Sequence, residues 1–506
     1  MQEQRNSVLQ PKYATAEKDV TPRPNAVFED LPTEILIDIF THMGWKDILN
    51  CRKVSRRLYQ ISTAQSLWMF IFQRLSTELL APPILERPIH AYTAKELEHI
   101  VFRRISSELA FAVNQAPRTQ PLDCPKVSSM GDDNFRLLQG GRWLLVTSPH
   151  PDMLPGCVYV FDLDKPFRQD FHCIIDTGDR TPGARWLIAS DIDKDAPSLT
   201  FNVCLVPGST IRSFSRDLAS AEFDNDIYPN TYMHDASVNI HVYRLTLNGC
   251  GSDAVLEAHK LRTIYAGLQL FTGDNLILCG HYLVRYIYDA RYTKRRVEVC
   301  NWFLSNSSYS KSYINSTGLK RPSFTLIRDG RLLIINENRI SLYELSMPPG
   351  KTVANAMLQP YWYREDVRNP EGPSRISKAY PDLRTNTTRA TVAFSDCIYG
   401  MLIPNDTSDP WFGRLCAGDL LVSPKIYLGI NKTFDQRQLE RITTTFIWPC
   451  DKDEQDGSLL IPTAERLLVY PDQLPCSFGP ALLDEHSNRV FFAGSYIWYI
   501  IDFAFN

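Results

Sequence analysis

The amino-acid sequence predicts an α+β multidomain protein with a small N-terminal helical domain, a linker helix and a large all-β domain. Apolar residues recur at helical spacing from residue 28 to about residue 112. From about residue 130 onward, Gly, Asp, Asn and Pro interrupt short apolar runs, which is typical of strands and turns. Similar turn-and-strand segments return there at intervals of roughly 55 to 65 residues or multiples of that spacing, and such a period indicates a repeat architecture.

The composition limits the class of protein. The 506 residues include 54 Lys and Arg against 57 Asp and Glu, so the formal net charge is −3. This balance argues against a nucleic-acid-binding protein, which usually carries a basic excess. Hydrophobic residues make up 44% of the chain and charged residues 22%, which excludes low-complexity and wholly disordered classes. A chain of this length is expected to form about two to four folded units.

The N-terminus and the cysteines set expectations for the compartment. Residues 1–27 are polar, show no periodicity and are predicted to form a disordered tail without a secretory signal. No run approaches the roughly 20 apolar residues of a membrane helix, so no membrane partner is expected. The 12 Cys contain no C-x-x-C pair, which argues against a paired-cysteine zinc site and a redox dithiol. We therefore expect a cytoplasmic and/or nuclear protein.

Residues 28–75 predict three short helices. The first begins near Pro32, whose missing N–H suits a first helical turn, and Gly44 ends it. The second is expected from Asp47 to Tyr59 and the third from Ala64 to Leu75. Three short helices build a small core and leave apolar surface over, which suggests that this domain docks on a partner.

The order of residues across these helices resembles an F-box. The series reads L-P-x-E-I-L-x-x-I-F from Leu31, D-I-L from Asp47, C-R-x-V-S-R-R-L-Y from Cys51 and L-W from Leu67. Tyr59, where the family often has Trp, is a mild departure from the pattern. The chain is similar in architecture to F-box proteins that fungi carry in large families.

This resemblance implies binding to a Skp-type adaptor, which links F-box proteins to cullin and RING subunits. Some of the motif's apolar residues are expected to face the adaptor and others to form the F-box core. The sequence alone does not divide the two groups, which together comprise Leu31, Pro32, Ile35, Leu36, Ile39, Phe40, Ile48, Leu49, Val54, Leu58 and Trp68.

Residues 76–129 predict a helical linker that also contains prolines. Thr93 and Glu96 form a capping-box pattern, so a helix is expected from about residue 93 to residue 112. Prolines from residue 117 onward then end helical structure. We expect the helix to fix the angle between the F-box and the β domain.

Residues 130–506 contain four clear copies of one pair of segments. Each copy is a turn and a strand, followed by a second strand that ends at or near an acidic residue. The paired segments lie at 141–146 and 157–162, 273–278 and 286–289, 330–335 and 340–345, and 488–493 and 497–502. Repetition of this kind predicts a degenerate β-propeller, because a closed ring leaves few exposed strand edges.

At this spacing the β domain is expected to hold six or seven blades. The apolar stretch from Val490 to Phe505 would close the ring against an early strand. No Trp-Asp dipeptide occurs, so the repeats are not a regular WD40 array. A pair of β-sandwiches or an irregular all-β domain is the alternative.

The motif search gives no complete catalytic, cofactor or metal site. The spaced acids at Asp191, Asp193 and Asp195 lack the glycine and the final Glu of a calcium loop. Neither G-x-S-x-G nor H-E-x-x-H occurs, and no cofactor is expected. One basic loop is a candidate for binding an acidic or phosphorylated target, and a solvated loop is the alternative. Its basic residues are Arg364, Arg368, Arg375, Lys378, Arg384 and Arg389.

These observations predict a binding protein that catalyses nothing itself. The first hypothesis is the substrate-receptor subunit of an SCF-type (Skp–cullin–F-box) ubiquitin ligase, whose β domain holds an unknown protein target. The alternative is a Skp-bound structural or regulatory protein that acts without cullin. A third hypothesis, an enzyme with a catalytic propeller, lacks any motif to support it.

Overall fold

The computed structural model divides into two compact units, residues 1–71 and residues 72–506. The predicted tail at residues 1–27 lies outside the residues that the structure describes. The described residues are 31–79, 81–113, 118–122, 135–147, 154, 156–165, 172–178, 185–208, 239–265, 270–289, 294–303, 311–315, 322–327, 329–336, 339–345, 356–365, 375–376, 379–383, 385–393, 397–406, 408–417, 421–422, 426–431, 440–445, 465–469, 478–484, 486–487, 489–494 and 498–502.

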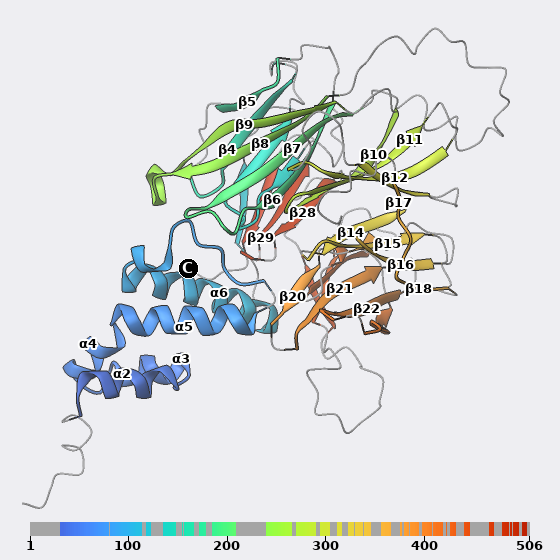
Figure 1. The fold of residues 1–506 in the computed structure, drawn as a ribbon. Helices are drawn as coiled ribbons and strands as arrows, with labels where there is room; N and C mark the ends of the chain where they lie inside the picture. The colour runs from blue at the N-terminus through green and yellow to red at the C-terminus, as the bar shows by residue number, and fades with distance from the viewer. Residues whose placement is uncertain are drawn as a thin grey trace, which may run out of the picture. The chain divides into compact units, whose positions relative to one another are not determined.

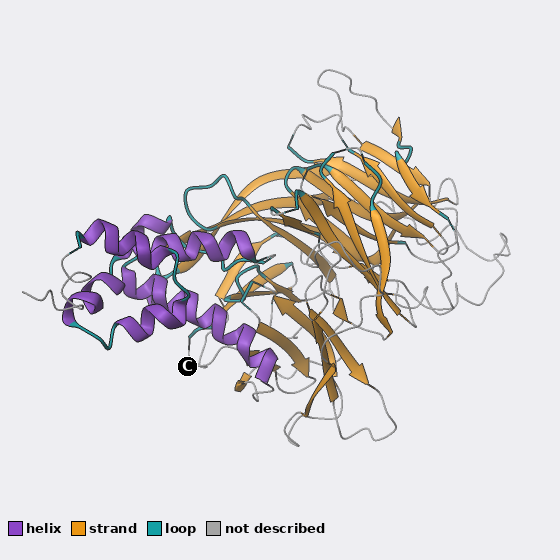
Figure 2. Cartoon of the chain, turned by 90° about the horizontal axis from the view of Figure 1, so that it is seen from below, coloured by secondary structure: helices purple, strands orange, loops and turns teal. Residues whose placement is uncertain are grey.

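The described part of the first unit is helical (Figure 2). Its elements are α2 (Thr33–Thr41), α3 (Trp45–Cys51), α4 (Arg56–Ser62) and the beginning of α5 (Gln65–Glu78). The prediction of one helix from residue 47 to residue 59 is wrong, because the chain breaks between α3 and α4. Ser55 adopts an extended backbone there, and its hydroxyl accepts a hydrogen bond from the backbone N–H of Leu58 at 3.2 Å. This is an N-cap, which starts a new helix.

The predicted linker helix belongs to the second unit, which begins at residue 72 within α5. Helix α6 runs from Ala94 to Val113, one residue later at each end than the sequence indicates. The capping box is confirmed: the backbone N–H of Thr93 donates to Glu96 Oε2 at 2.7 Å, and the backbone N–H of Glu96 donates to Thr93 Oγ1 at 3.3 Å.

In the described part of the chain, the β domain contains seven sheets in sequence order, here numbered blades 1 to 7 (Figure 1). Blade 1 comprises β2 (Phe135–Leu137), β3 (Trp143–Thr147), β4 (Cys157–Asp162) and β5 (His172–Asp176). Blade 2 comprises β6 (Arg185–Ile192), β7 (Thr200–Gly208), β8 (Asn239–Asn248) and β9 (Val255–Tyr265). Blade 3 comprises β10 (Leu270–Cys279), β11 (Tyr282–Asp289), β12 (Lys294–Asn301), β13 (Lys311–Asn315) and β17 (Ala356–Met357).

The later blades follow the same meander. Blade 4 comprises β14 (Ser323–Ile327), β15 (Arg331–Asn336), β16 (Arg339–Glu344) and β18 (Trp362–Arg364). Blade 5 comprises β19 (Arg375–Ile376), β20 (Tyr380–Asp382), β21 (Thr387–Ala393), β22 (Cys397–Pro404) and β23 (Trp411–Ala417). Blade 6 comprises β24 (Leu421–Val422), β25 (Ile426–Asn431), β26 (Glu440–Thr445) and β27 (Glu465–Val469). Blade 7 comprises β28 (Phe478–Asp484), β29 (Arg489–Gly494), β30 (Trp498–Asp502) and β1 (Arg118–Leu122).

Successive blades contact one another mainly through their first strands, as in a propeller. Contacts join β28 to β2, β2 to β6, β6 to β10, β10 to β14 and β14 to β19, and β21 of blade 5 contacts β24 of blade 6. Within each blade the neighbouring strands run antiparallel, except for the short parallel pairing of β13 with β17. This arrangement confirms the predicted propeller-like β domain.

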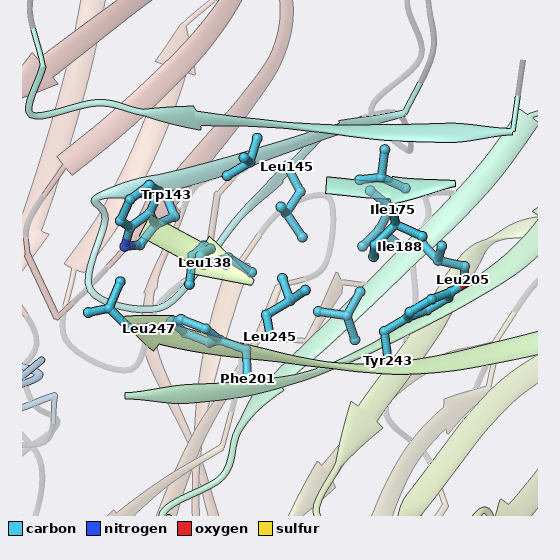
Figure 3. Packing of buried hydrophobic residues seen from close by; sticks show 14 of the residues in the cluster. Leu138, Trp143, Leu145, Ile175, Ile188, Phe201, Leu205, Tyr243, Leu245 and Leu247 are labelled. Atoms are coloured by element: carbon cyan, nitrogen blue, oxygen red, sulfur yellow. The ribbon is translucent and has the colours of Figure 1, made fainter. Parts of the chain in front are cut away.

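Apolar side chains fill the layers between successive blades. One cluster joins blades 1 and 2, with Leu145 and Val158 meeting Phe201 and Leu245 (Figure 3). Further clusters join blades 2 and 3, 3 and 4, 4 and 5, and 7 and 1. Because neighbouring blades cover both faces of a blade, the side chains on both faces of its inner strands are buried. This explains why every residue of the Trp143–Thr147 strand is buried.

The chain termini of the β domain meet in blade 7. Strand β1 pairs antiparallel with β30, so that Gln120 lies opposite Ile500. The expectation that the C-terminal apolar stretch pairs with an early strand is therefore confirmed. That early strand lies inside residues 76–129, so the segment assigned to the linker also supplies a strand of the β domain.

Charged groups hold the linker against blades 1 and 7. Arg103 of α6 forms an ion pair with Asp502 at 2.7 Å, and Arg104 donates to the carbonyl of His486 at 3.2 Å. Nearer the start of the unit, Glu86 forms an ion pair with Arg142 of blade 1. The linker helix is thus a part of the β-domain unit, with partners on both sides of the ring closure.

Candidate functional site

The helical unit distributes its eleven motif residues over buried, half-buried and exposed positions. Five of the eleven predicted residues have side chains no more than 4% exposed, and these are Leu36, Phe40, Ile48, Leu58 and Trp68. Three others, Leu31, Ile39 and Leu49, are half-buried. The remaining three, Pro32, Ile35 and Val54, are exposed.

Trp68 anchors the core of this unit. Its indole Nε1 donates to the carbonyl of Ser62 at 2.8 Å, which satisfies the one polar atom of a fully buried ring. The Arg52 guanidinium lies 5.5 Å from the centre of that ring and donates to Ser62 Oγ at 2.9 Å. These contacts connect the end of α3 and the end of α4 to α5. The core of the unit therefore packs without the exposed motif residues.

Exposed apolar side chains remain on elements that pack together. Ile35 of α2 is 48% exposed and Val54, in the break between α3 and α4, is 73% exposed. Two further residues, Tyr59 at 54% and Phe70 at 40%, were missed by the sequence analysis. Tyr59 had one available signal, namely its position where the family often has Trp. Their exposure makes these four side chains available for contact with a partner.

Basic groups surround one of these residues, Tyr59. A shallow depression of about 530 Å³ is lined by Arg52, Lys53, Ser55, Arg56, Tyr59 and Gln60. Burial and the nearby Asp47 carboxylate raise the pKa of the Cys51 thiol, so it stays protonated at neutral pH and is a poor nucleophile. The depression thus combines the exposed Tyr59 ring with basic groups, which suits contact with a protein.

The predicted basic target loop is not a single loop. Arg364 lies in β18, Arg375 in β19 and Arg389 in β21. The assignment of Arg389 to a target-binding surface is wrong, because its side chain is 1% exposed and forms an ion pair with Asp382. Burial of a charge requires such a partner, and the guanidinium is unavailable to a target. Three predicted residues, Arg368, Lys378 and Arg384, lie outside the described residues.

The spaced acids of the β domain have structural partners. Asp193 accepts from Arg244 at 2.8 Å, and Asp191 accepts the backbone N–H of Gly280 in blade 3 at 2.7 Å. Among the described residues, no group of three or more His, Cys, Asp or Glu side chains is placed to hold a metal ion. No helix in the same part of the chain is long and apolar enough to cross a membrane.

Comparisons with known proteins agree with the helical unit. The F-box-like family model matches residues 28–74. No curated protein matches the chain.

Among solved structures, Trypanosoma rangeli sialidase in complex with sialic acid is similar at 8% identity and a TM-score of 0.36, covering 77% of this chain and 59% of that one. A mutant of the same sialidase displaying trans-sialidase activity gives 9% identity and a TM-score of 0.32, covering 65% and 57%. A prolyl endopeptidase structure gives 11% identity and a TM-score of 0.24, covering 87% and 58%. The chain thus spans less than two thirds of each of these structures, and the propeller description depends on its own sheet topology.

Residues 28–74 form an F-box-like domain, which implies binding to a Skp-type adaptor, and an all-β domain of propeller-like architecture follows it.

Proposed function

We propose that this chain is the substrate-receptor subunit of an SCF-type ubiquitin ligase. The observation that carries the proposal is the exposure of Ile35 and Val54 on an F-box-like domain whose core is already closed. Burying apolar side chains of this size against an adaptor is worth roughly 1.5–3 kcal/mol each. The adaptor would in turn recruit the cullin and RING subunits.

The β domain holds the target in this proposal. The chain catalyses nothing, and rate enhancement comes from holding a lysine of the target near the ubiquitin thioester. A propeller suits that role because its rigid blades present loops and strand edges at fixed positions. The protein would act in the cytoplasm and/or the nucleus.

Adaptor binding is tested with the full chain and a purified Skp-type adaptor. Changing Val54→Asp places a charge at an exposed apolar position, and we expect affinity to fall at least about tenfold. The matched control is Leu261→Asp, which places the same charge on an exposed residue of blade 2 and should leave affinity unchanged. Equal affinities for both variants would contradict the surface assignment.

A reconstituted ligase then distinguishes the two functional hypotheses. If the chain is a substrate receptor, adding cullin and RING subunits to the adaptor complex produces cullin-dependent ubiquitination of the chain or of a bound protein. A stable adaptor complex that never engages cullin would instead favour the structural or regulatory role.

A further inference from the structure

Residues 356–364 form an exposed aromatic segment that passes from blade 3 to blade 4. It begins with β17, which pairs with β13, and ends with β18, which pairs with β16. The side chains of Met357, Tyr361 and Tyr363 are 41%, 44% and 54% exposed. Met, Tyr and Arg are the residue types enriched in the centres of protein interfaces.

The segment is held firmly while these side chains stay exposed. The backbone N–H of Leu358 donates to the carbonyl of Tyr313 at 2.9 Å, and that of Tyr361 donates to the carbonyl of Leu342 at 3.0 Å. Trp362 packs against the apolar layer between blades 4 and 5. A preorganised surface loses little conformational entropy when a partner binds.

An arginine stacks on an aromatic ring on each side of β18. The Arg339 guanidinium lies 4.0 Å from the centre of the Tyr363 ring. The Arg364 guanidinium lies 5.4 Å from the centre of the Phe412 ring, which stacks on Tyr399 at 4.8 Å. Neither of these arginines forms an ion pair with another residue that the structure describes.

Strand β18 is the outermost strand of its sheet (Figure 1). The strand order is β14-β15-β16-β18, and within the described residues no further strand lies beyond β18. Such an edge offers backbone N–H and C=O groups that can pair with another extended segment. Successive side chains of an added strand point to opposite faces of the sheet. Side chains on one face can therefore reach Arg339, and side chains on the other face can reach Arg364.

We propose that this edge binds an extended acidic segment of the target protein, which adds a strand to blade 4. We call it the β18 edge site and define it by Arg339, Tyr361, Tyr363 and Arg364. Backbone pairing supplies the register, the tyrosines supply apolar contact, and the arginines select carboxylates. The inference depends on the proposed function and names the substrate class that the β domain receives.

The probe is a library of random twelve-residue peptides, selected on the full chain bound to its Skp-type adaptor. We expect the selected peptides to be acidic. Their dissociation constants, measured by fluorescence anisotropy, should rise at least about tenfold for Tyr363→Ala and for Arg364→Glu. N-methylation of the best peptide should weaken binding at alternating positions, since only alternate amides face the paired strand.

The matched controls lie on β9, the outermost strand of blade 2. Leu261→Ala and Lys260→Glu remove similar contact and charge there and should leave peptide binding unchanged. Three outcomes would overturn the inference: no selected peptides, basic peptides, or peptides whose binding ignores the β18 variants. The inference would also be overturned if the chain formed a dimer that Tyr363→Ala dissociates. That result would show that the edge mediates self-association. Adaptor binding is measured separately on the same variants, so failure here is distinguishable from failure of the proposed function.

Discussion

Single residues decide the division between core and surface in the F-box-like domain. Phe40 is fully buried, and changing Phe40→Ala should cost about 3–5 kcal/mol of unfolding free energy. A domain of short helices has little stability to spare, so this change should unfold α2–α4. Hydrogen exchange in the full chain should show those helices losing protection while blades 1–5 keep theirs. The control is Val54→Ala, whose 73% exposure predicts a change within about 0.5 kcal/mol.

A buried ion pair gives the second prediction at this scale. The side chains of Arg389 and Asp382 are 1% and 2% exposed and form an ion pair between the neighbouring strands β21 and β20 of blade 5. Removing one partner with Arg389→Ala leaves a buried charge and should cost about 3–5 kcal/mol, read as a lower melting temperature of the β domain. Arg364→Ala, at an exposed position, should leave the melting temperature unchanged. An unchanged melting temperature for Arg389→Ala would contradict the structural role of this ion pair.

Residue-type rules explain both the successes and the errors here. Arg is exposed by default, so the sequence placed Arg389 on a surface and offered no reason to pair it with Asp382. The sequence likewise left Ile35 and Leu36 undivided. They are neighbours on one apolar stripe, and only the packing of α2 on α4 shows which of them points inward. Burial therefore had to come from the structure.

At the scale of elements, α6 depends on its capping box. Hydrogen bonds from the backbone N–H and the hydroxyl of Thr93 lower the pKa of Glu96 and outweigh the opposing effect of burial. Changing Thr93→Ala removes the hydroxyl and should cost about 0.5–2 kcal/mol of helix stability. NMR titration should show the pKa of Glu96 rising toward its ordinary value. An unchanged pKa would contradict the capping role.

The same cap has a defined pH dependence. Because the pKa of Glu96 is lower in the folded chain, its stabilising effect is fully present above the ordinary pKa of a glutamate. That effect is lost as the pH falls through the folded pKa. The stability difference between the parent chain and Glu96→Gln should therefore be largest at neutral pH and shrink in acid. Denaturation at two pH values checks this, and a difference that grows in acid would contradict it.

Local signals predicted some elements well and others badly. The α6 helix was found to within one residue because its cap lies in four consecutive positions. The copies near residues 141, 330 and 488 correspond to the second and third strands of blades 1, 4 and 7, whereas the copy near 273 forms the first two strands of blade 3. Alternation of apolar segments and turns reports a strand, and it carries no information on the strand's place in the sheet.

For the whole molecule, the closure of the ring joins parts of the chain that are distant in sequence. Asp502 at the end of β30 accepts from Arg489 of β29 at 3.0 Å and from Arg103 of α6 at 2.7 Å. Arg489 also forms an ion pair at 2.6 Å with Asp164, in the turn that follows β4 of blade 1. Opposing charges stay hydrated in an open chain, so their pairing appears only once the blades have met. The periodicity of the sequence predicted the ring. It did not predict strand β1, because that short segment contains a proline and was assigned to the linker.

The last prediction concerns this closure. Replacing residues 118–122 with a Gly-Ser segment of equal length removes the strand that pairs with β30 and leaves an open edge on blade 7. We expect the β domain to melt at a lower temperature and to aggregate. Adaptor binding should persist, because the F-box-like domain belongs to a separate compact unit. A replacement with alternating Val and Thr should restore the melting temperature, since it supplies backbone pairing without the native side chains. Unchanged melting of the Gly-Ser variant would show that β1 is dispensable for closing the ring.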